Sequence, residues 1–397
     1  MIKHRQTRSL LRTAKQIDTW FLGKYQIGLY RGCQHACIYC DGRYEKYNFE
    51  GEFGTDIEIK ANGLDLLQKE LERVKEPGFT FIGSGITDAY QPLEAKCRLS
   101  RQALQMLNDK NMPVHVLTKS ALIERDFDLY ENIAKKSTAI ISFSITSDNE
   151  RTRQLLEPRT APLSERWRIL KAARERGINT GAMLLPVIPF ISDSAEEMDR
   201  MLQKASEAEV DFVMFGGMTL KSGRQKDFFM DFIRQNIPRL EPQFIKLYAN
   251  NDPYGQAVPP YYEKINSIFY PLARKYGIQI RIPRELFSGV IPCYTEAAIL
   301  LAHIGDYLQT KGIRRKAYQY AGYAIQKWAF ELKKKIGRKK EFHYTQIEEE
   351  FKRQVKSGDI KKLSGIGETI YNMLLEYINT GKISYYEQVR RDYMKMS

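Results

Sequence analysis

The chain has few cysteines and no long hydrophobic run. Only 5 of its 397 residues are cysteine, and three of these stand in one short stretch, which excludes the disulfide framework of small secreted proteins. No stretch approaches the roughly 18 consecutive apolar residues that a membrane-spanning helix needs. The first residues, MIKHRQTRSLLR, lack the apolar core of a signal peptide. We therefore expect a soluble cytoplasmic protein without a membrane partner.

Positive charge is abundant but unevenly spread. The formal net charge is +14, and residues 305–397 hold 20 Lys and Arg against 11 Asp and Glu. The blocks KGIRRK and KKKIGRKK concentrate this charge further. Such a basic region favours a polyanionic partner, although a solvated helical surface would also explain the charge alone.

Three cysteines occur close together in the run RGCQHACIYCDGRY. Cys33, Cys37 and Cys40 have the spacing CxxxCxxC, and Tyr39 directly precedes the last of them. Three thiolates on one loop can hold three irons of a [4Fe-4S] cluster and leave the fourth iron open for a small molecule. The alternative is a structural zinc site that uses His35 or a distant cysteine as its fourth ligand. Zinc sites favour paired CxxC knuckles or Cys and His in sets of four, and no second pair exists here, so the spacing favours the cluster.

The first 300 residues alternate between short apolar runs and segments of helical periodicity. Six strand and helix units in series predict an α/β fold with a parallel sheet and right-handed crossovers, curled into a partial (β/α)6 barrel. The chemistry of such barrels lies at the carboxyl ends of the strands, and the cysteine loop follows the first expected strand. The expected strands are 26–30, 79–83, 114–118, 139–145, 181–186 and 212–216.

Several expected strand ends carry glycine or polar residues where a ligand can lie. Backbone N–H groups beside glycine can approach a ligand closely because glycine has no side-chain bulk. Ordinary turns and surface charges would explain each residue singly, but their recurrence at one end of successive strands favours a binding site. The candidates are Gly83, Ser84 and Gly85 after the second strand, Lys119 after the third, Ser142 and Ser144 in the fourth, and Arg159 in the following loop.

These segments together resemble a known family. RSLL, GCQHACIYCDGRY, TDAYQP, LTKS, EPRTAP and PVIPFISD, in this order, are similar to the spore photoproduct lyase-like branch of the radical S-adenosylmethionine (SAM) superfamily, also called DNA repair photolyase-like. The resemblance covers about residues 5 to 300. It implies a cluster on Cys33, Cys37 and Cys40, reductive cleavage of SAM to a 5'-deoxyadenosyl radical, and an electron donor such as a flavodoxin or ferredoxin.

The resemblance also implies which residues contact SAM. Tyr39 would lie beside the adenine. The amino acid part or the ribose would be contacted by Gly83, Ser84, Gly85, Lys119, Ser142 and Arg159.

The chain departs from the family pattern at three places. Asp41 stands where the usual YCYAR has an aromatic residue, and Ala89 replaces the proline of TDPYQ. The stretch SGITD lacks the cysteine that returns a hydrogen atom in authentic spore photoproduct lyase. Cys97 and Cys293 are the remaining candidates for a hydrogen donor, and burial in the core is the other explanation for both.

The last 93 residues are expected to form a separate all-α unit, so we expect domains at 1–304 and 305–397. The segment LSGIG between two helical segments is typical of a helix-hairpin-helix, in which N–H groups at a helix start face a DNA phosphate. The candidate DNA-binding residues are Gly365, Gly367, Lys361, Lys362 and Lys382.

This unit is similar to the amino-terminal lyase domain of family X DNA polymerases. Met373 and Thr369 stand at the positions of two lysines of that domain, so the resemblance implies DNA binding without its lyase chemistry. A helical protein-interaction domain is the alternative.

The sequence thus predicts a two-domain radical SAM enzyme that abstracts a hydrogen atom from a nucleic acid, in DNA repair or modification. A lyase of the spore photoproduct lyase type is one candidate class. Two alternatives stay open at this point. One is a radical SAM enzyme acting on RNA or protein, with the basic region as a tether. The other is a DNA-binding iron-sulfur protein without turnover.

Overall fold

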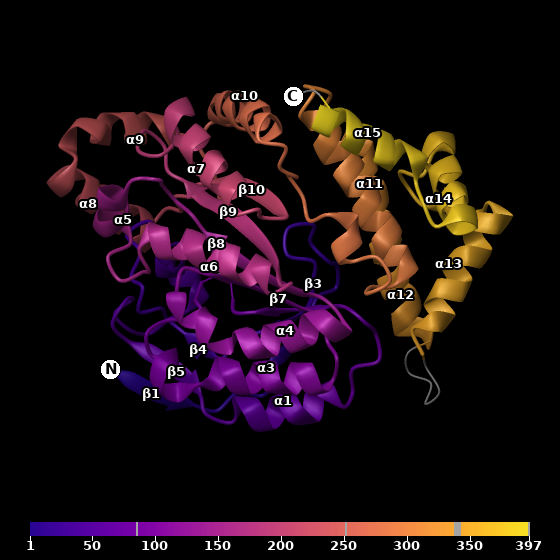
Figure 1. Ribbon diagram of the computed structural model, residues 1–397, viewed down its shortest axis with the longest axis horizontal. Coiled ribbons are helices and arrows are strands. Elements are labelled where there is room, and N and C mark those ends of the chain that lie inside the picture. The colour runs from indigo at the N-terminus through magenta and orange to yellow at the C-terminus, as the bar shows by residue number, and fades with distance from the viewer. Residues whose placement is uncertain (85, 251, 337–342, 396–397) are drawn as a thin grey trace.

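The computed structural model describes residues 1–84, 86–250, 252–336 and 343–395 (Figure 1). Gly85, one of the candidate site residues, and residues 337–340 of the basic block KKKIGRKK lie outside this part of the chain. No helix in the described part is long and apolar enough to cross a bilayer.

A seven-stranded sheet forms the centre of the molecule, in the order β10-β9-β8-β7-β6-β3-β2. Six of its strands are parallel neighbours, and β2 (Leu11–Thr13) pairs antiparallel with β3. The α/β class and the parallel strands in series are confirmed. The parallel strands are β3 (Gly23–Ile27), β6 (Phe79–Ile82), β7 (Val114–Thr118), β8 (Ala139–Ser144), β9 (Asn179–Val187) and β10 (Phe212–Gly217).

The first expected strand, residues 26–30, is wrong in its position. β3 ends at Ile27, and Tyr30–Arg31 form a separate strand, β4, in a second sheet of order β1-β5-β4. Neither β1 (Ile2–Arg5) nor β5 (Ile57–Lys60) was expected, because both runs are short and carry charges. This small sheet leads directly into the cysteine loop.

Amphipathic helices follow the strands and cover the sheet (Figure 1). Their buried stripes, such as Ala103, Leu104 and Leu107 of α3, join the core against the sheet. The helices up to residue 275 are α1 (Gly63–Leu71), α2 (Glu94–Cys97), α3 (Leu99–Asp109), α4 (Phe127–Lys136), α5 (Glu150–Leu156), α6 (Leu163–Glu175), α7 (Ala195–Glu207), α8 (Arg224–Asn236), α9 (Glu241–Leu247) and α10 (Pro259–Lys275).

The remaining helices gather at one side of the molecule, coloured orange to yellow in Figure 1. We call α11–α15 the helical unit: α11 (Cys293–Gln309), α12 (Ala317–Ile336), α13 (Thr345–Ser357), α14 (Glu368–Thr380) and α15 (Ser384–Lys395). The expected domain boundary after residue 304 falls inside α11. This helix packs tightly on α12, since a Cβ on Gly322 would lie 2.5 Å from the carbonyl oxygen of Ala298. A cut at residue 304 would therefore divide a packed helix.

A buried carboxylate fastens the helical unit to the sheet. Glu76 is 2% exposed and lies between Lys24 of β3 and Lys333 of α12, with N–O distances of 2.8 and 2.6 Å. The hydroxyl of Tyr294 in α11 donates to the same carboxylate at 2.7 Å. A second contact joins α12 to the chain before β3, where Gln326 exchanges hydrogen bonds with the backbone of Ile17.

Candidate functional site

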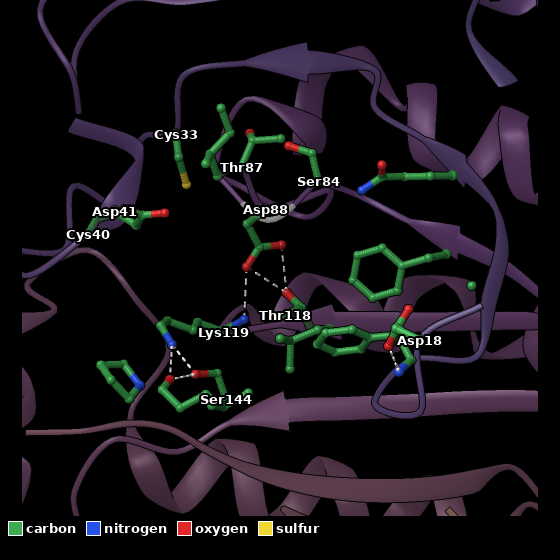
Figure 2. Close-up of a pocket in the computed structure, with 18 of the residues that line it drawn as sticks. Asp18, Cys33, Cys40, Asp41, Ser84, Thr87, Asp88, Thr118, Lys119 and Ser144 are labelled. Carbon is green, nitrogen blue, oxygen red and sulfur yellow. Dashed lines mark hydrogen bonds between the residues drawn. The ribbon is translucent and has the colours of Figure 1, made fainter. Parts of the chain in front are cut away.

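A cavity of about 730 Å³ lies at the carboxyl ends of the parallel strands. Figure 2 shows Cys33, Cys40 and Asp41 on one side of it and Asp18 on the opposite side, with Asp88, Thr118 and Lys119 between them. Each parallel strand contributes lining residues from its end or from the loop that follows it. Among them are Cys33, Cys37, Tyr39 and Cys40 after β3 and β4, Ser84, Thr87 and Asp88 after β6, Thr118 and Lys119 at β7, Ser144 at β8, Leu185 and Pro186 in β9, and Gly217, Met218 and Thr219 at β10.

The three loop cysteines all line this cavity and are free of disulfides. Cys33 and Cys37 are buried, and Cys40 is half-buried. Burial raises the pKa of all three thiols, and the neighbouring Cys40 adds to the rise at Cys33 and Cys37. The sulfurs therefore lie near enough to influence one another, and metal binding at this site would release their protons.

The segment TDAYQ, residues 87–91, holds the cysteine loop in place. A glycine is required where the loop begins, because Gly32 has φ +80° and a Cβ there would lie 2.5 Å from the carbonyl oxygen of Asp56. Four hydrogen bonds join the two segments: Thr87 Oγ1 to Gly32 O (2.6 Å), Gln91 Nε2 to Gly32 O (3.4 Å), His35 Nε2 to Asp88 Oδ2 (3.1 Å) and Gln34 N to Gln91 Oε1 (2.9 Å).

Asp88 connects three strand ends at the centre of the site. Its carboxylate accepts from the Thr118 hydroxyl and from the Lys119 N–H, both at 2.8 Å (Figure 2). It also accepts from the Tyr90 N–H at 2.8 Å. Burial alone would raise the pKa of Asp88, but the hydrogen bonds from His35 and from these backbone groups hold it below its usual value. Asp88 is thus a buried anion that orders the loop and the cavity floor. It was not among the sequence candidates, although it lies within TDAYQ.

A second buried carboxylate organises the side chains around Tyr39 and Lys119. Glu157, which is 1% exposed, accepts hydrogen bonds from the hydroxyl of Tyr39 and from Arg166 Nη2, the latter at 2.7 Å. The ammonium of Lys119 also lies 3.5 Å from this carboxylate and donates to Ser144 Oγ. Burial would raise the pKa of Glu157, but Lys119 and Arg166 lower it far below its usual value. Lys119 therefore brings a fixed positive charge to the cavity wall.

Some sequence candidates do not reach the cavity. Arg159 is exposed, and its guanidinium donates to the carbonyl of Gly54 at 2.7 Å. Ser142 lies two residues before Ser144 on β8, is fully buried, and bonds His115 Nε2 at 2.8 Å. Gly83 is also not a lining residue, whereas Ser84 is. The expectation that Arg159, Ser142 and Gly83 contact a ligand directly is therefore not supported by their positions.

The two candidate hydrogen donors also lie elsewhere. Cys97 ends α2, and Cys293 starts α11, where its N–H donates to Glu348 at 2.7 Å. Neither lines the cavity, so the structure gives the hydrogen-donor role no support at either position.

Asp41, one of the departures from the family pattern, has a defined place in the cavity wall. Its Oδ2 accepts from Lys221 Nζ at 2.8 Å and from the Tyr47 hydroxyl at 2.5 Å. Lys221 follows β10, so this ion pair joins the end of the cysteine loop to the last strand of the sheet. Sequence reasoning missed it because the two residues are far apart along the chain.

Comparison with known proteins identifies the family. A model described as the radical SAM superfamily matches residues 27–205, which include all three loop cysteines and the strands from β6 to β9. An uncharacterized protein of Methanocaldococcus jannaschii is 30% identical over 217 residues, 54% of this chain and 77% of that protein. The chain belongs to the radical SAM superfamily. An uncharacterized protein of Mycobacterium tuberculosis is 28% identical over 277 residues, 68% of this chain and 80% of that protein.

Two solved structures of spore photoproduct lyase show the same fold over about two thirds of this chain. Spore photoproduct lyase complexed with dinucleoside spore photoproduct superposes with a TM-score of 0.52 at 15% identity, covering 69% of this chain and 79% of that one. A spore photoproduct lyase variant with bound S-adenosylmethionine gives a TM-score of 0.51 at 15% identity and the same coverage. At this identity the likeness establishes the fold.

The cofactors of this radical SAM protein are a [4Fe-4S] cluster and S-adenosylmethionine. The residues present fit them, because three free thiols share one wall of a cavity that extends well beyond them. Among the described residues, no three His, Cys, Asp or Glu side chains are placed to hold a single metal ion.

Proposed function

We propose that this chain is a radical SAM enzyme that abstracts a hydrogen atom from a nucleic acid, most directly DNA, in repair or modification. The observation that carries the proposal is the attachment of a basic helical unit to the same sheet whose strand ends hold the three-thiol cavity. In this view residues 1–304 include a partial (β/α)6 barrel, and the helices after it bind the substrate. The spore photoproduct lyase structures support a DNA lesion as substrate, since one holds a dinucleoside spore photoproduct.

Within this proposal Cys33, Cys37 and Cys40 hold the cluster. When bound, the cluster and SAM supply an electron and a 5'-deoxyadenosyl radical for hydrogen abstraction. The protein keeps the loop rigid through Thr87, Asp88 and the other bonds from TDAYQ, and Arg43 adds bonds to the carbonyls of Ala36 and Cys37.

Tyr39, Ser84 and Lys119 are the proposed SAM contacts. The hydroxyl of Tyr39 is engaged by Glu157, so this residue offers its ring rather than its hydroxyl to a ligand. Lys119 offers a charge for a carboxylate, because Glu157 at 3.5 Å neutralises it only partly and Ser144 fixes its direction.

Replacing Lys119 with alanine should weaken SAM binding roughly ten- to a hundred-fold, because a charge-assisted hydrogen bond worth about 1.5–3 kcal/mol is lost. Cluster content should stay near normal, since Lys119 is no iron ligand. Equilibrium dialysis of the iron-loaded protein with labelled SAM measures the change. Arg159→Ala is the matched control, because this exposed cation lies outside the cavity and its removal should leave SAM affinity unchanged. Equal SAM affinity in wild type and Lys119→Ala would show that Lys119 does not contact SAM.

The proposed DNA contact is a helix-hairpin-helix formed by residues 363–367 between η6 (Asp359–Lys362) and α14. Gly365 has φ +90°, and the Ile366 N–H bonds the Leu363 carbonyl at 3.1 Å, which closes the turn. Gly367 begins α14 without a side-chain cap, so the first N–H groups of this helix face outward to an approaching phosphate. Lys361 and Lys362 are exposed directly before the turn, and Lys382 is exposed just after the end of α14.

Gly367→Asp tests this contact without disturbing the fold. A Cβ on Gly367 would meet nothing within 4 Å, and aspartate is a favoured helix N-cap, so the variant should fold at least as well as wild type. Its carboxylate would stand where a phosphate is expected, and DNA affinity should fall at least tenfold. Gly367→Asn introduces an N-cap of the same shape without the charge. Its loss of DNA affinity should be clearly smaller than that of Gly367→Asp.

The readout combines DNA affinity with 5'-deoxyadenosine release by the reduced enzyme. DNA should stimulate release in wild type, and Gly367→Asp should need more DNA for the same stimulation while its release without DNA is unchanged. Stimulation by RNA or a protein instead of DNA would select that alternative function. Equal DNA affinity in all three proteins would show that the hairpin is not the DNA contact.

A further inference from the structure

Helix α12 exposes two large aromatic rings in a row. Tyr320 is 62% exposed and Tyr323 is 53% exposed, although most aromatic residues of this chain are buried or half-buried. They are three residues apart, so they lie next to each other on one face of the helix. Within the described part of the chain, neither hydroxyl has a hydrogen-bond partner, so packing and hydrogen bonding of the chain itself do not account for the two rings.

The two rings lie between the hairpin turn, which is the proposed DNA contact, and the chain around Ile17, which borders the cavity. At one end, Tyr320 lies beside the hairpin turn, since a Cβ on Gly365 would be 3.8 Å from the Cβ of Tyr320. At the other end, Gln326 stands three residues beyond Tyr323 and bonds the backbone N–H and carbonyl of Ile17 at 2.6 and 3.1 Å. Gln16 and Asp18, on either side of Ile17, line the cavity. From residue 320 to residue 326 the helix rises by only about 9 Å.

The surroundings of the row suit a polyanion. Lys316 is exposed directly before α12, and Lys327 is exposed on the helix itself. Neither has an ion pair within the described residues. Exposed aromatic rings bordered by lysines bind single-stranded nucleic acid, because any base can stack on a ring while the lysines meet its phosphates. A rigid duplex cannot bring a base to the thiols inside a cavity, so a base that reacts there has to leave the stack.

We propose that Tyr320 and Tyr323 are a stacking platform for unpaired bases of the nucleic acid, lying between the hairpin and the rim of the cavity. The proposal rests on the proposed function, which makes a nucleic acid the substrate, and adds that its unpaired segment is what α12 recognises. The hairpin would hold the flanking phosphates, the two rings would hold unstacked bases, and the segment around Ile17 would receive the strand at the cavity.

The test uses the full-length protein and two DNA probes. One is a blunt-ended linear duplex without unpaired bases, and the other is the same duplex with a single-stranded extension of six nucleotides that carries 2-aminopurine. Tyr320→Ala/Tyr323→Ala should weaken binding of the extended probe about tenfold or more, given about 1–3 kcal/mol per stacked base, and should leave blunt-duplex affinity within twofold. Binding of wild type should quench the 2-aminopurine fluorescence of the extended probe. With the double alanine variant bound, the fluorescence should stay near that of the free probe.

Two controls separate stacking from other roles. Tyr320→Phe/Tyr323→Phe keeps both rings and should bind and quench like wild type. Tyr254→Ala removes a tyrosine of similar exposure, 68%, from the turn before α10, and should change neither probe. The variants remove exposed side chains, so their melting temperatures should match wild type.

Each other outcome overturns the platform. Unchanged affinity and quenching in the double alanine variant, or an equal loss for both probes, would show that the rings do not read unpaired bases. If wild type binds the blunt duplex but gains nothing from the extension, the platform fails while the proposed function stands. If wild type binds neither probe, the nucleic-acid function itself fails, and a protein partner for this face becomes the better explanation.

Discussion

Cys37→Ala is expected to abolish both the iron-sulfur cluster and the release of 5'-deoxyadenosine. Three thiolates are the whole ligand set that this loop offers, and a cluster that loses one of three protein ligands loses its site rather than part of its affinity. The loop itself should survive, because its backbone contacts do not depend on the sulfur. The Ile38 N–H bonds the Leu156 carbonyl at 2.9 Å, and Arg43 bonds the carbonyl of Cys37.

The measurement is iron and sulfide content after anaerobic reconstitution, followed by the visible spectrum with and without SAM. Wild type should bind about four irons and change its spectrum on SAM addition. Cys97→Ala is the matched control, since this thiol is half-buried, lies outside the cavity, and should be dispensable for the cluster. Full iron content in Cys37→Ala, or stoichiometric zinc in anaerobically purified wild type, would contradict the cluster assignment.

The sequence predicted the parallel sheet well because its strands are apolar and follow one another through amphipathic helices. Val114–Thr118 is a strand in both the prediction and the structure. The strands that the sequence did not predict are those that form only by pairing with residues far away in the chain. The strands β1 (IKHR) and β5 (IEIK) have only four residues each, too few for a strand pattern to stand out, and they pair only because residues 2–5 and 57–60 meet in space.

The candidate site shows the same division. The cysteines were found through their CxxxCxxC spacing. Lys119 was found because it follows a strand, and the ends of parallel strands converge at one edge of the sheet. In the EPRTAP segment, Arg159 was named as a candidate from the sequence and Glu157 was not. Glu157 points inward to Tyr39 and Arg166, whereas Arg159 points outward to Gly54. The direction of a side chain in an irregular loop is set by tertiary contacts, which the sequence pattern does not contain.

The expected domain boundary after residue 304 lies inside α11 for a related reason. A change in charge after residue 304 marks where the surface becomes basic, but it does not mark where packing changes. The buried side of α11 runs from Tyr294 to Leu308 without a break, so the helix belongs to one packed layer on both sides of the expected boundary. Truncation at residue 304 would therefore expose this layer, and point variants are the better test of the helical unit.

Glu76→Ala should be among the most destabilising single substitutions outside the cluster loop. The carboxylate is buried between Lys24 and Lys333 and also accepts from Tyr294, so its removal leaves Lys24, itself 8% exposed, as a buried cation without its partner. Breaking one side of a buried ion pair costs about 3–5 kcal/mol. Urea denaturation at pH 7, followed by circular dichroism, should show a loss of this size in the free energy of unfolding.

The pH dependence of this loss gives an independent check. Burial would raise the pKa of Glu76, but Lys24 and Lys333 lower it below its ordinary value of 4.5. A carboxyl whose pKa is depressed in the folded state stabilises the fold above its unfolded pKa, and this stabilisation disappears as pH falls through the folded value. The stability difference between wild type and Glu76→Gln should therefore be constant from pH 7 to about pH 5 and shrink below about pH 4.5.

Glu263→Ala is the matched control. This substitution removes an exposed partner of Arg314 and should lower the free energy of unfolding by no more than about 1 kcal/mol at any of these pH values. A loss in Glu76→Ala as small as that of Glu263→Ala would show that the buried carboxylate does not fasten the helical unit to the sheet.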